Sequence, residues 1–295
     1  MRLGYFLSAW LSCFFPFVVH SHPLDLEGTS NKNSAGRVIV YPKLFQVDDS
    51  TYPIKVLDAA LTKAGIHHLL VSSETPMLQD RALRSIATND EIDVFWSLTT
   101  VQREQQLRAV RFPIDKGLYG WRVLLVHPEK LKKSLNLADL RNWQYTQGHD
   151  WPDFDILQRN TLSVISANNF HSMVDLVQSG RVDAFPRSVL EVWQEIEQHQ
   201  IKLQVHPDVV LHYPTALYFF FSKENEQLAQ QVEHGLELLL ASGEFDQMFF
   251  DNFGSFLQQA GLEHRQIIEL QNPFLPLTTP LHRPELWYKP NVNSP

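Results

Sequence analysis

Small hydroxyl side chains and one arginine follow an apolar, strand-like run at residues 92–96. Ser97, Thr99 and Thr100 come directly after this run. Arg103 then falls in what should be the first turn of a helix, where free backbone N–H groups and the helix dipole favour an anion. Its planar guanidinium suits a carboxylate or phosphate. The segment predicts an anion site; the alternative is an ordinary helix start, with a threonine as N-cap and the arginine paired on the surface.

Three aromatic side chains could form the walls of a binding pocket. Trp96 ends the strand-like run, Tyr41 ends an earlier one, and Trp151 follows a turn at residues 148–150. Most pockets are apolar with a few placed polar groups, and tryptophan suits such a lining. Packing in the core is the alternative, above all for Trp96.

Strand and helix patterns alternate along the chain that carries these residues. The amphipathic pattern at 53–64 begins with a proline and ends before Gly65, as helices often do. Expected strands are at 37–41, 68–72, 92–96, 123–126, 143–146, 162–165, 181–185 and 216–222. Expected helices are at 53–64, 77–86, 137–140, 153–159, 170–179, 188–199, 224–242 and 244–260. This alternation predicts an α/β fold with largely parallel sheets covered by helices.

The first residues have the pattern of a secretory signal. Arg2 is the only charge before Asp25, and an apolar stretch covers residues 3–19 with Pro16 inside it. Small or medium side chains precede a cleavage point that we expect after Ser21. An uncleaved membrane anchor is the alternative, although about 17 apolar residues are at the short limit for spanning a bilayer. We therefore expect a periplasmic protein.

Composition excludes several classes of function. The net charge is −8, from 25 basic and 33 acidic residues, which argues against nucleic acid or an anionic membrane surface as the partner. Cys13 is the single cysteine and lies in the expected signal. Cleavage would leave neither a disulfide framework nor a catalytic thiol. The length allows one large domain or two lobes of about 100 residues each.

The residues around the arginine turn resemble the extracellular solute-binding proteins of family 3, the polar amino acid type. The resemblance is carried by Asp93, Thr100, Arg103 and the run Phe-Pro-Ile-Asp-Lys-Gly-Leu-Tyr at 112–119. It extends over residues 37–253, although the spacing from strand to arginine is tighter than the family's by a residue or two. It implies a type 2 periplasmic-binding-protein fold: two α/β lobes, each a mostly parallel sheet flanked by helices, joined by two hinge crossings near residues 119–121 and 213–214.

This resemblance also implies a division of the chain. The expected parts are a signal peptide at 1–21, lobe 1 at 37–119 with a return part at 214–262, lobe 2 at 120–213, and a proline-rich tail at 263–295. We expect the tail from residue 271 onward to wrap a surface without regular structure.

The resemblance implies that two arginines, Arg103 and Arg187, contact the ligand. Family members use an arginine at the position of Arg103 to hold the ligand's carboxylate. They often place an aspartate four or five residues after the position of Asp183 to pair with an ammonium, where this chain has Arg187 and Ser188. Because a cation there should repel an ammonium, we expect an anionic or carboxylate-bearing solute. The alternative is that Arg187 points away and pairs with Glu191 one turn on.

The function implied is binding of a small polar solute by cleft closure, for delivery to an ABC permease, by a monomer. Presentation to a membrane sensor kinase, an enzyme on the same fold, and a degenerate non-binding protein are the alternatives. The neighbours His67 and His68 would point to opposite faces of a strand, and the chain contains no HExxH pattern. It also contains no GxSxG elbow, P-loop or GxGxxG motif. We therefore predict no metal site, no cofactor, no catalytic residue and no enzymatic activity.

Overall fold

Two neighbouring strands and a covering helix begin the part of the chain that the computed structural model describes. That part comprises residues 36–43, 52–132, 135, 137–149 and 151–291. The expected signal and its cleavage after Ser21 lie outside it. All of the described residues belong to one compact unit of the chain. No helix within the described residues is long and apolar enough to cross a membrane.

Strands β1 (Arg37–Tyr41) and β2 (His68–Ser72) pair in parallel, as their sequence patterns predicted. Helix α1 (Tyr52–Lys63) connects them and buries one apolar face. That face packs against helix α8 (Glu226–Ser242), where the backbones meet closely enough to require Gly235. The 3.6-residue spacing of apolar side chains in α1 therefore fixed both the helix and its buried side.

A second, antiparallel sheet lies beside this pair. Among the described residues its strand order is β3 (Phe95–Leu98), β10 (Leu217–Phe221) and β4 (Arg108–Val110). Helix α2 (Gln79–Ala87) packs on this sheet and helix α3 (Val101–Gln106) joins β3 to β4. All five residues of β10 are buried, which explains its uniformly apolar sequence.

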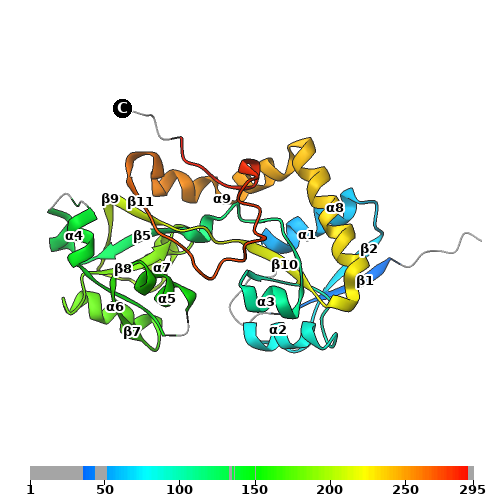
Figure 1. Cartoon of the computed structure of the whole chain (residues 1–295), viewed down its shortest axis with the longest axis horizontal. Coiled ribbons are helices and arrows are strands. Elements are labelled where there is room, and N and C mark those ends of the chain that lie inside the picture. The colour runs from blue at the N-terminus through cyan, green and yellow to red at the C-terminus, as the bar shows by residue number, and fades with distance from the viewer. Residues whose placement is uncertain (1–35, 44–51, 133–134, 136, 150, 292–295) are drawn as a thin grey trace, which may run out of the picture. The chain divides into compact units, whose positions relative to one another are not determined.

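Six strands of the described residues form the third sheet (Figure 1). Its order is β11 (Gln266–Glu269), β9 (Gln204–His212), β5 (Trp121–Val126), β8 (Ala184–Ser188), β6 (Gln144–Gly148) and β7 (Ser163–Ala167). Its helices are α4 (Leu137–Asn142), α5 (Pro152–Arg159), α6 (Phe170–Gln178) and α7 (Val192–Gln198). In this sheet, β6 runs parallel to β7 and β8, and β5 pairs antiparallel with β8 and β9. In the three-stranded sheet, β10 pairs antiparallel with β3 and β4. Strands β5 and β10 are the strands that follow the two crossings.

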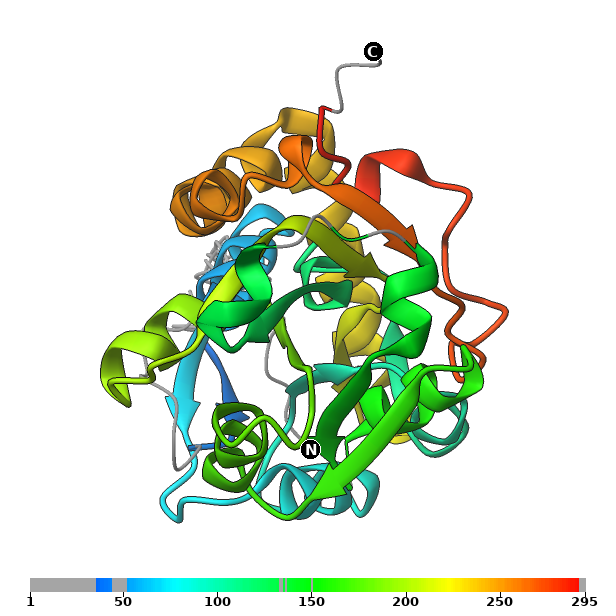
Figure 2. The same cartoon turned by 90° about the vertical axis from the view of Figure 1, so that its left-hand side faces the viewer.

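Strands β4, β9 and β11 were not predicted from the sequence. Strand β9 contains Pro207, which normally argues against a strand. The proline lies where the register between β5 and β9 shifts, between the pairs Val123–Val210 and Leu125–Val205, so the irregularity accommodates it. Strand β11 lies beside β9 at the edge of the sheet (Figure 2), within the expected tail at 263–295 but before residue 271, where irregular structure was expected to begin.

Helices α8 and α9 (Glu244–Ala260) meet at Gly243, whose φ of 80° ends the first helix as predicted. After β11, residues 271–291 contain turns and one short 3-10 helix, η5 (Pro284–Leu286). Strand β11 ends before residue 271, so it does not bear on the expectation of irregular structure from there onward. Within 271–291 the departure from that expectation is η5, where Leu286 packs in the core.

Candidate functional site

The turn between β3 and α3 holds Arg103 against its own backbone. Thr100 is the N-cap of α3, and its hydroxyl accepts a 3.2 Å bond from the Arg103 N–H. Arg103 Nη1 donates to Ser97 Oγ at 2.9 Å and to the carbonyl of Leu98. The N-cap alternative is thus confirmed for Thr100, while the guanidinium folds back across the turn.

The charge of Arg103 is only weakly compensated. Burial lowers the pKa of Arg103, and the carboxylate of Asp80 partly offsets that effect. The hydrogen bonds of its side chain within the described residues go to a hydroxyl and a carbonyl and not to a carboxylate. The neighbouring Glu104 accepts instead from Thr99 Oγ1 and Arg111 Nε, each at 2.8 Å. A partly desolvated cation without a contacting anion favours an anionic ligand.

Tyr41 and Trp96 lie in the core beside this turn. They are 8% and 9% exposed, and their ring centroids are 6.3 Å apart. Both belong to the largest apolar cluster of the described residues. Core packing therefore accounts for both side chains, and contact with a ligand stays a prediction.

Arg187 in β8 is paired with two carboxylates. Its Nε donates to Glu195 at 2.8 Å and its Nη2 to Glu191 at 2.9 Å. The guanidinium carbon also lies 5.1 Å from the ring centroid of Trp151 and 5.2 Å from that of Phe185. Glu191, the partner expected in the alternative interpretation, is therefore present. Together with Glu195 it gives this group one positive and two negative charges, a net charge of −1.

Ser188 follows Arg187 and is fully buried. Its hydroxyl accepts a 3.2 Å hydrogen bond from the backbone N–H of Leu190. The bond stabilises the turn after β8, so the observed role of Ser188 is structural and a ligand contact stays a prediction.

A second buried ion pair was not predicted from the sequence. Arg122 Nη2 lies 2.7 Å from Asp153 Oδ1, and Arg122 Nε donates to the Tyr213 hydroxyl at 2.9 Å. Although burial lowers the pKa of Arg122, Asp153 and Tyr213 raise it above its usual value. One feature of the sequence could have revealed this pair. Arg122 is a lone arginine in the otherwise apolar strand β5, and a buried cation needs an anionic partner.

A narrow cavity separates this ion pair from the β3–α3 turn. Its volume is about 20 Å³, close to the space one water needs. Leu98, Thr99 and Thr100 line one side, and Arg122 and Asp153 line another. The remaining walls come from Pro152, Ile156, Tyr213, Thr215, Asn272 and Phe274. The three-stranded sheet and the six-stranded sheet thus meet at the hydroxyl turn that the sequence singled out.

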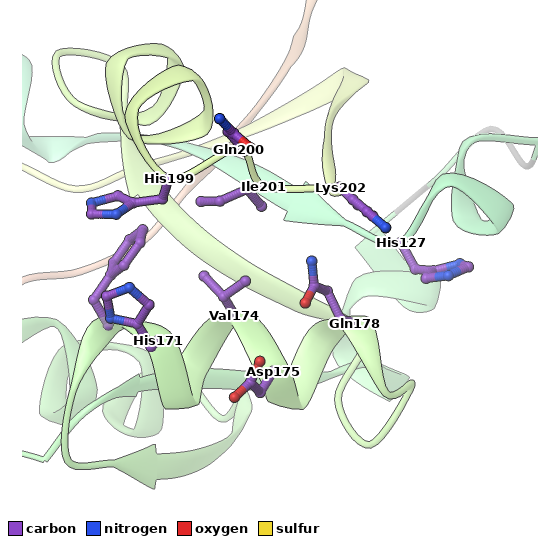
Figure 3. A pocket seen from close by; sticks show the side chains of 10 residues that line it. His127, His171, Val174, Asp175, Gln178, His199, Gln200, Ile201 and Lys202 are labelled. Atoms are coloured by element: carbon purple, nitrogen blue, oxygen red, sulfur yellow. The ribbon is translucent and has the colours of Figure 1, made fainter.

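A larger cavity of about 480 Å³ lies on the six-stranded part, beside α6 (Figure 3). Val174 and Ile201 form its apolar surface, and the rings of His171 and His199 lie 5.2 Å apart at one end. No group of three or more potential metal-binding residues occurs in the described ranges. The sequence patterns did not predict this cavity.

Comparisons with known proteins identify the fold. No protein-family model and no curated protein matches the chain. Among solved structures, the probable amino-acid ABC transporter extracellular-binding protein ytmK of Bacillus subtilis is similar, with a TM-score of 0.60 and 14% identity over 74% of this chain and 98% of that one. An ancestral arginine-binding protein bound to arginine has a TM-score of 0.50 and 17% identity over 74% and 98%. The ancestral amino acid-binding protein AncCDT-1, a precursor of cyclohexadienyl dehydratase, has a TM-score of 0.50 and 15% identity over 74% and 96%.

These likenesses confirm the type 2 periplasmic-binding-protein fold expected from the sequence. Of these neighbours, one is a probable amino-acid ABC transporter extracellular-binding protein and another is an arginine-binding protein bound to arginine. At these identities the comparisons establish the architecture, while the ligand has to be argued from the site.

Proposed function

We propose that this protein binds a small polar solute carrying a carboxylate or similar anionic group, between two lobes and outside the cytoplasm. The observation that supports this proposal is the environment of Arg103. Its guanidinium is partly desolvated, and its side-chain hydrogen bonds go to Ser97 and Leu98 and not to a carboxylate. A carboxylate would accept charge-assisted bonds from it and offset its desolvation.

This proposal keeps the lobe limits that the resemblance implied. Residues 37–119 and 214–262 form one lobe and residues 120–213 the other. The crossings between them contact each other, because the Tyr213 N–H donates to the Gly120 carbonyl at 3.2 Å. Closure would rotate the lobes about these crossings and bury the solute, as hinge motions do in this fold.

The charge around Arg187 broadens the class of ligand. The expectation of a purely anionic solute depended on an unpaired cation in β8. Glu191 and Glu195 instead give that group a net charge of −1, and the Glu191 side chain is 36% exposed. Repulsion by Arg187 therefore no longer argues against a ligand that carries an ammonium group. A zwitterion that places its carboxylate on Arg103 is also compatible with the site. Trp151, stacked near Arg187, would supply an apolar wall.

The proposed partner of the loaded protein is an ABC permease, reached by a periplasmic monomer after removal of the signal. The neighbours' description as ABC transporter binding proteins supports this choice over presentation to a sensor kinase. An enzyme remains a weaker alternative, supported by the neighbour described as a precursor of a dehydratase.

One observation favours a second candidate, a degenerate protein that no longer binds a solute. The cavity that touches both the Thr99–Thr100 turn and the Arg122–Asp153 pair holds about 20 Å³, too little for an amino acid. In a binding protein, opening of the hinge would enlarge this space enough to admit a solute. In a degenerate protein, the space would bind no solute even after opening.

A thermal-shift screen separates the two candidates. The panel contains amino acids, dicarboxylates, phosphorylated solutes and sulfonates. A ligand at about 100 times its Kd should stabilise the folded state by about 2.7 kcal/mol. A hit among compounds with a carboxylate or another anionic group supports the proposal. Hits confined to cations without such a group, or no hit at all, would contradict it.

A further inference from the structure

Residues 271–288, called the strap below, are fastened to the second crossing, to the chain directly before the first, and to both lobes. The first fastening is to the lobe 2 helix α5. Asn160, which caps the end of α5, exchanges two hydrogen bonds with the backbone of Gln271, of 2.7 Å and 2.8 Å. Arg159 lies over the ring of Phe274, 5.9 Å from its centroid. The strap therefore begins on lobe 2.

The next contact holds the second crossing. Asn272 Nδ2 donates to the carbonyl of Pro214 at 2.9 Å. Asn272 and Phe274 also form part of the wall of the narrow cavity beside the Thr99–Thr100 turn. The strap thus touches both a hinge segment and the candidate site.

The middle of the strap is tied to lobe 1. Thr278 Oγ1 donates to Glu104 at 3.2 Å, on the helix that carries Arg103. Arg283 makes two hydrogen bonds to the carboxylate of Glu237 in α8, of 2.6 Å and 2.9 Å. Such a bidentate arginine–carboxylate contact fixes the orientation of the two side chains as well as their distance.

The last contacts are made to Lys116 and Gly117, directly before the first crossing. The backbone N–H of Tyr288 donates to the Lys116 carbonyl at 2.8 Å, and Lys116 Nζ donates to the Glu285 carbonyl at 2.7 Å. The ring of Trp287 lies so close to Gly117 that a Cβ there would approach it to 2.7 Å. Gly117 also has a φ of 76°, which favours glycine. Glycine is therefore required here both by the backbone conformation and by the close approach of Trp287.

We infer that the strap sets the angle between the lobes of the proposed binding site. Hinge rotation changes the backbone angles of the crossings, and the strap is bonded to the main chain at Lys116, three residues before the first crossing, and at Pro214 in the second. Because it is also bonded to α5, α3 and α8, the lobes cannot rotate without shifting one of these contacts. The inference deepens the proposed function, but its test needs no ligand, so failure of one leaves the other standing.

Distances between two spin labels would test the inference in the full chain. Labels on cysteines replacing Arg84 in α2 and Ser166 in β7, both exposed, report the separation of the lobes once Cys13→Ser removes the native thiol. Asn272→Ala removes the hydrogen bond to the second crossing, and Trp287→Ala removes the ring that packs against Gly117 beside the first. Leu277→Ala is the matched control, because this strap residue is fully exposed.

We expect Asn272→Ala and Trp287→Ala to broaden the distance distribution or shift its mean by more than about 2 Å, the scale of a domain rearrangement. Leu277→Ala should match the parent. Circular dichroism verifies folding, and if Trp287→Ala does not fold, Asn272→Ala together with Arg283→Ala decides the question. Distributions equal to the parent's in folded variants, even with a lowered melting temperature, would overturn the inference, since the strap would then only add stability.

Discussion

Arg103 Nη1 lies 2.9 Å from Ser97 Oγ, across the turn that joins β3 to α3. This bond holds the guanidinium in place before any ligand arrives, which lowers the entropy cost of binding. Arg187 differs, because Glu191 and Glu195 already neutralise it. Of these two arginines, Arg103 is the better candidate for an anion.

Replacing Arg103 by alanine should weaken binding of a solute found in the screen. Loss of a charge-assisted bond in a closed site costs about 1.5–3 kcal/mol, roughly 10- to 150-fold in Kd. Calorimetric titration of the variant measures this change. Arg181→Ala is the control, since it removes an exposed arginine from the other lobe. Equal affinities of Arg103→Ala and the parent would exclude the arginine from the site.

Removing Arg187 should destabilise the fold rather than change ligand affinity alone. Arg187→Met would leave Glu191 and Glu195 close together without their cation, which for a buried pair costs about 3 kcal/mol. Urea unfolding measures the loss, and adding Glu195→Gln should recover part of it. A loss below about 0.5 kcal/mol, typical of a surface site, would show that water replaces the arginine without penalty.

Asp115 should make stability depend on pH. Burial raises the pKa of Asp115 from 3.8 to about 6, although the N–H groups of Tyr119, Gly117 and Leu217 act in the opposite direction. Between about pH 4 and 6 the folded state therefore keeps a proton that the unfolded state has lost, so stability falls as pH rises through this window.

The variant Asp115→Asn isolates this effect, since the amide does not titrate. The stability of the parent relative to this variant should fall by about 3 kcal/mol between pH 4 and 7, from roughly two pKa units. Urea unfolding at both pH values gives the difference. A difference that stays constant with pH would mean that the carboxyl keeps its ordinary pKa in the fold.

Two helical glycines should respond oppositely to alanine. In α8, a Cβ at Gly235 would approach the Ala60 carbonyl oxygen to 1.9 Å, so Gly235→Ala must separate α8 from α1. We expect it to cost about 1–3 kcal/mol or more. In α9, Gly254 has open space around its Cα, so Gly254→Ala should stabilise by about 0.5–1 kcal/mol. Thermal melts of both variants suffice, and a stabilising Gly235→Ala would refute the close packing.

The α/β fold was predictable because local patterns carry it. Strands β1 and β2 have the bounds that their apolar runs indicated, and α1 begins one residue before the predicted start. Strand β9 was missed because its proline is tolerated only by the irregular pairing with β5. Strand β11 was missed because a short strand at the edge of a sheet has little pattern of its own.

The candidate site was predictable only in part. The arginine turn is local, and the sequence placed Ser97, Thr100 and Arg103 together correctly. The possible pairing of Arg187 with Glu191 was also visible, since the two lie four residues apart. The second carboxylate, Glu195, comes from the same helix, but its approach depends on how α7 packs against β8.

By itself the sequence determined most of the helices and strands, the α/β class and the turn that presents Arg103, because each depends on neighbours within a few residues. Only the tertiary structure decided which distant charges meet. Arg122 and Tyr213 are 91 positions apart, and Tyr213 and Asp153 are 60 apart. The strap likewise contacts Lys116 across more than half of the chain. No local pattern encodes such contacts, because folding of the whole chain brings these residues together.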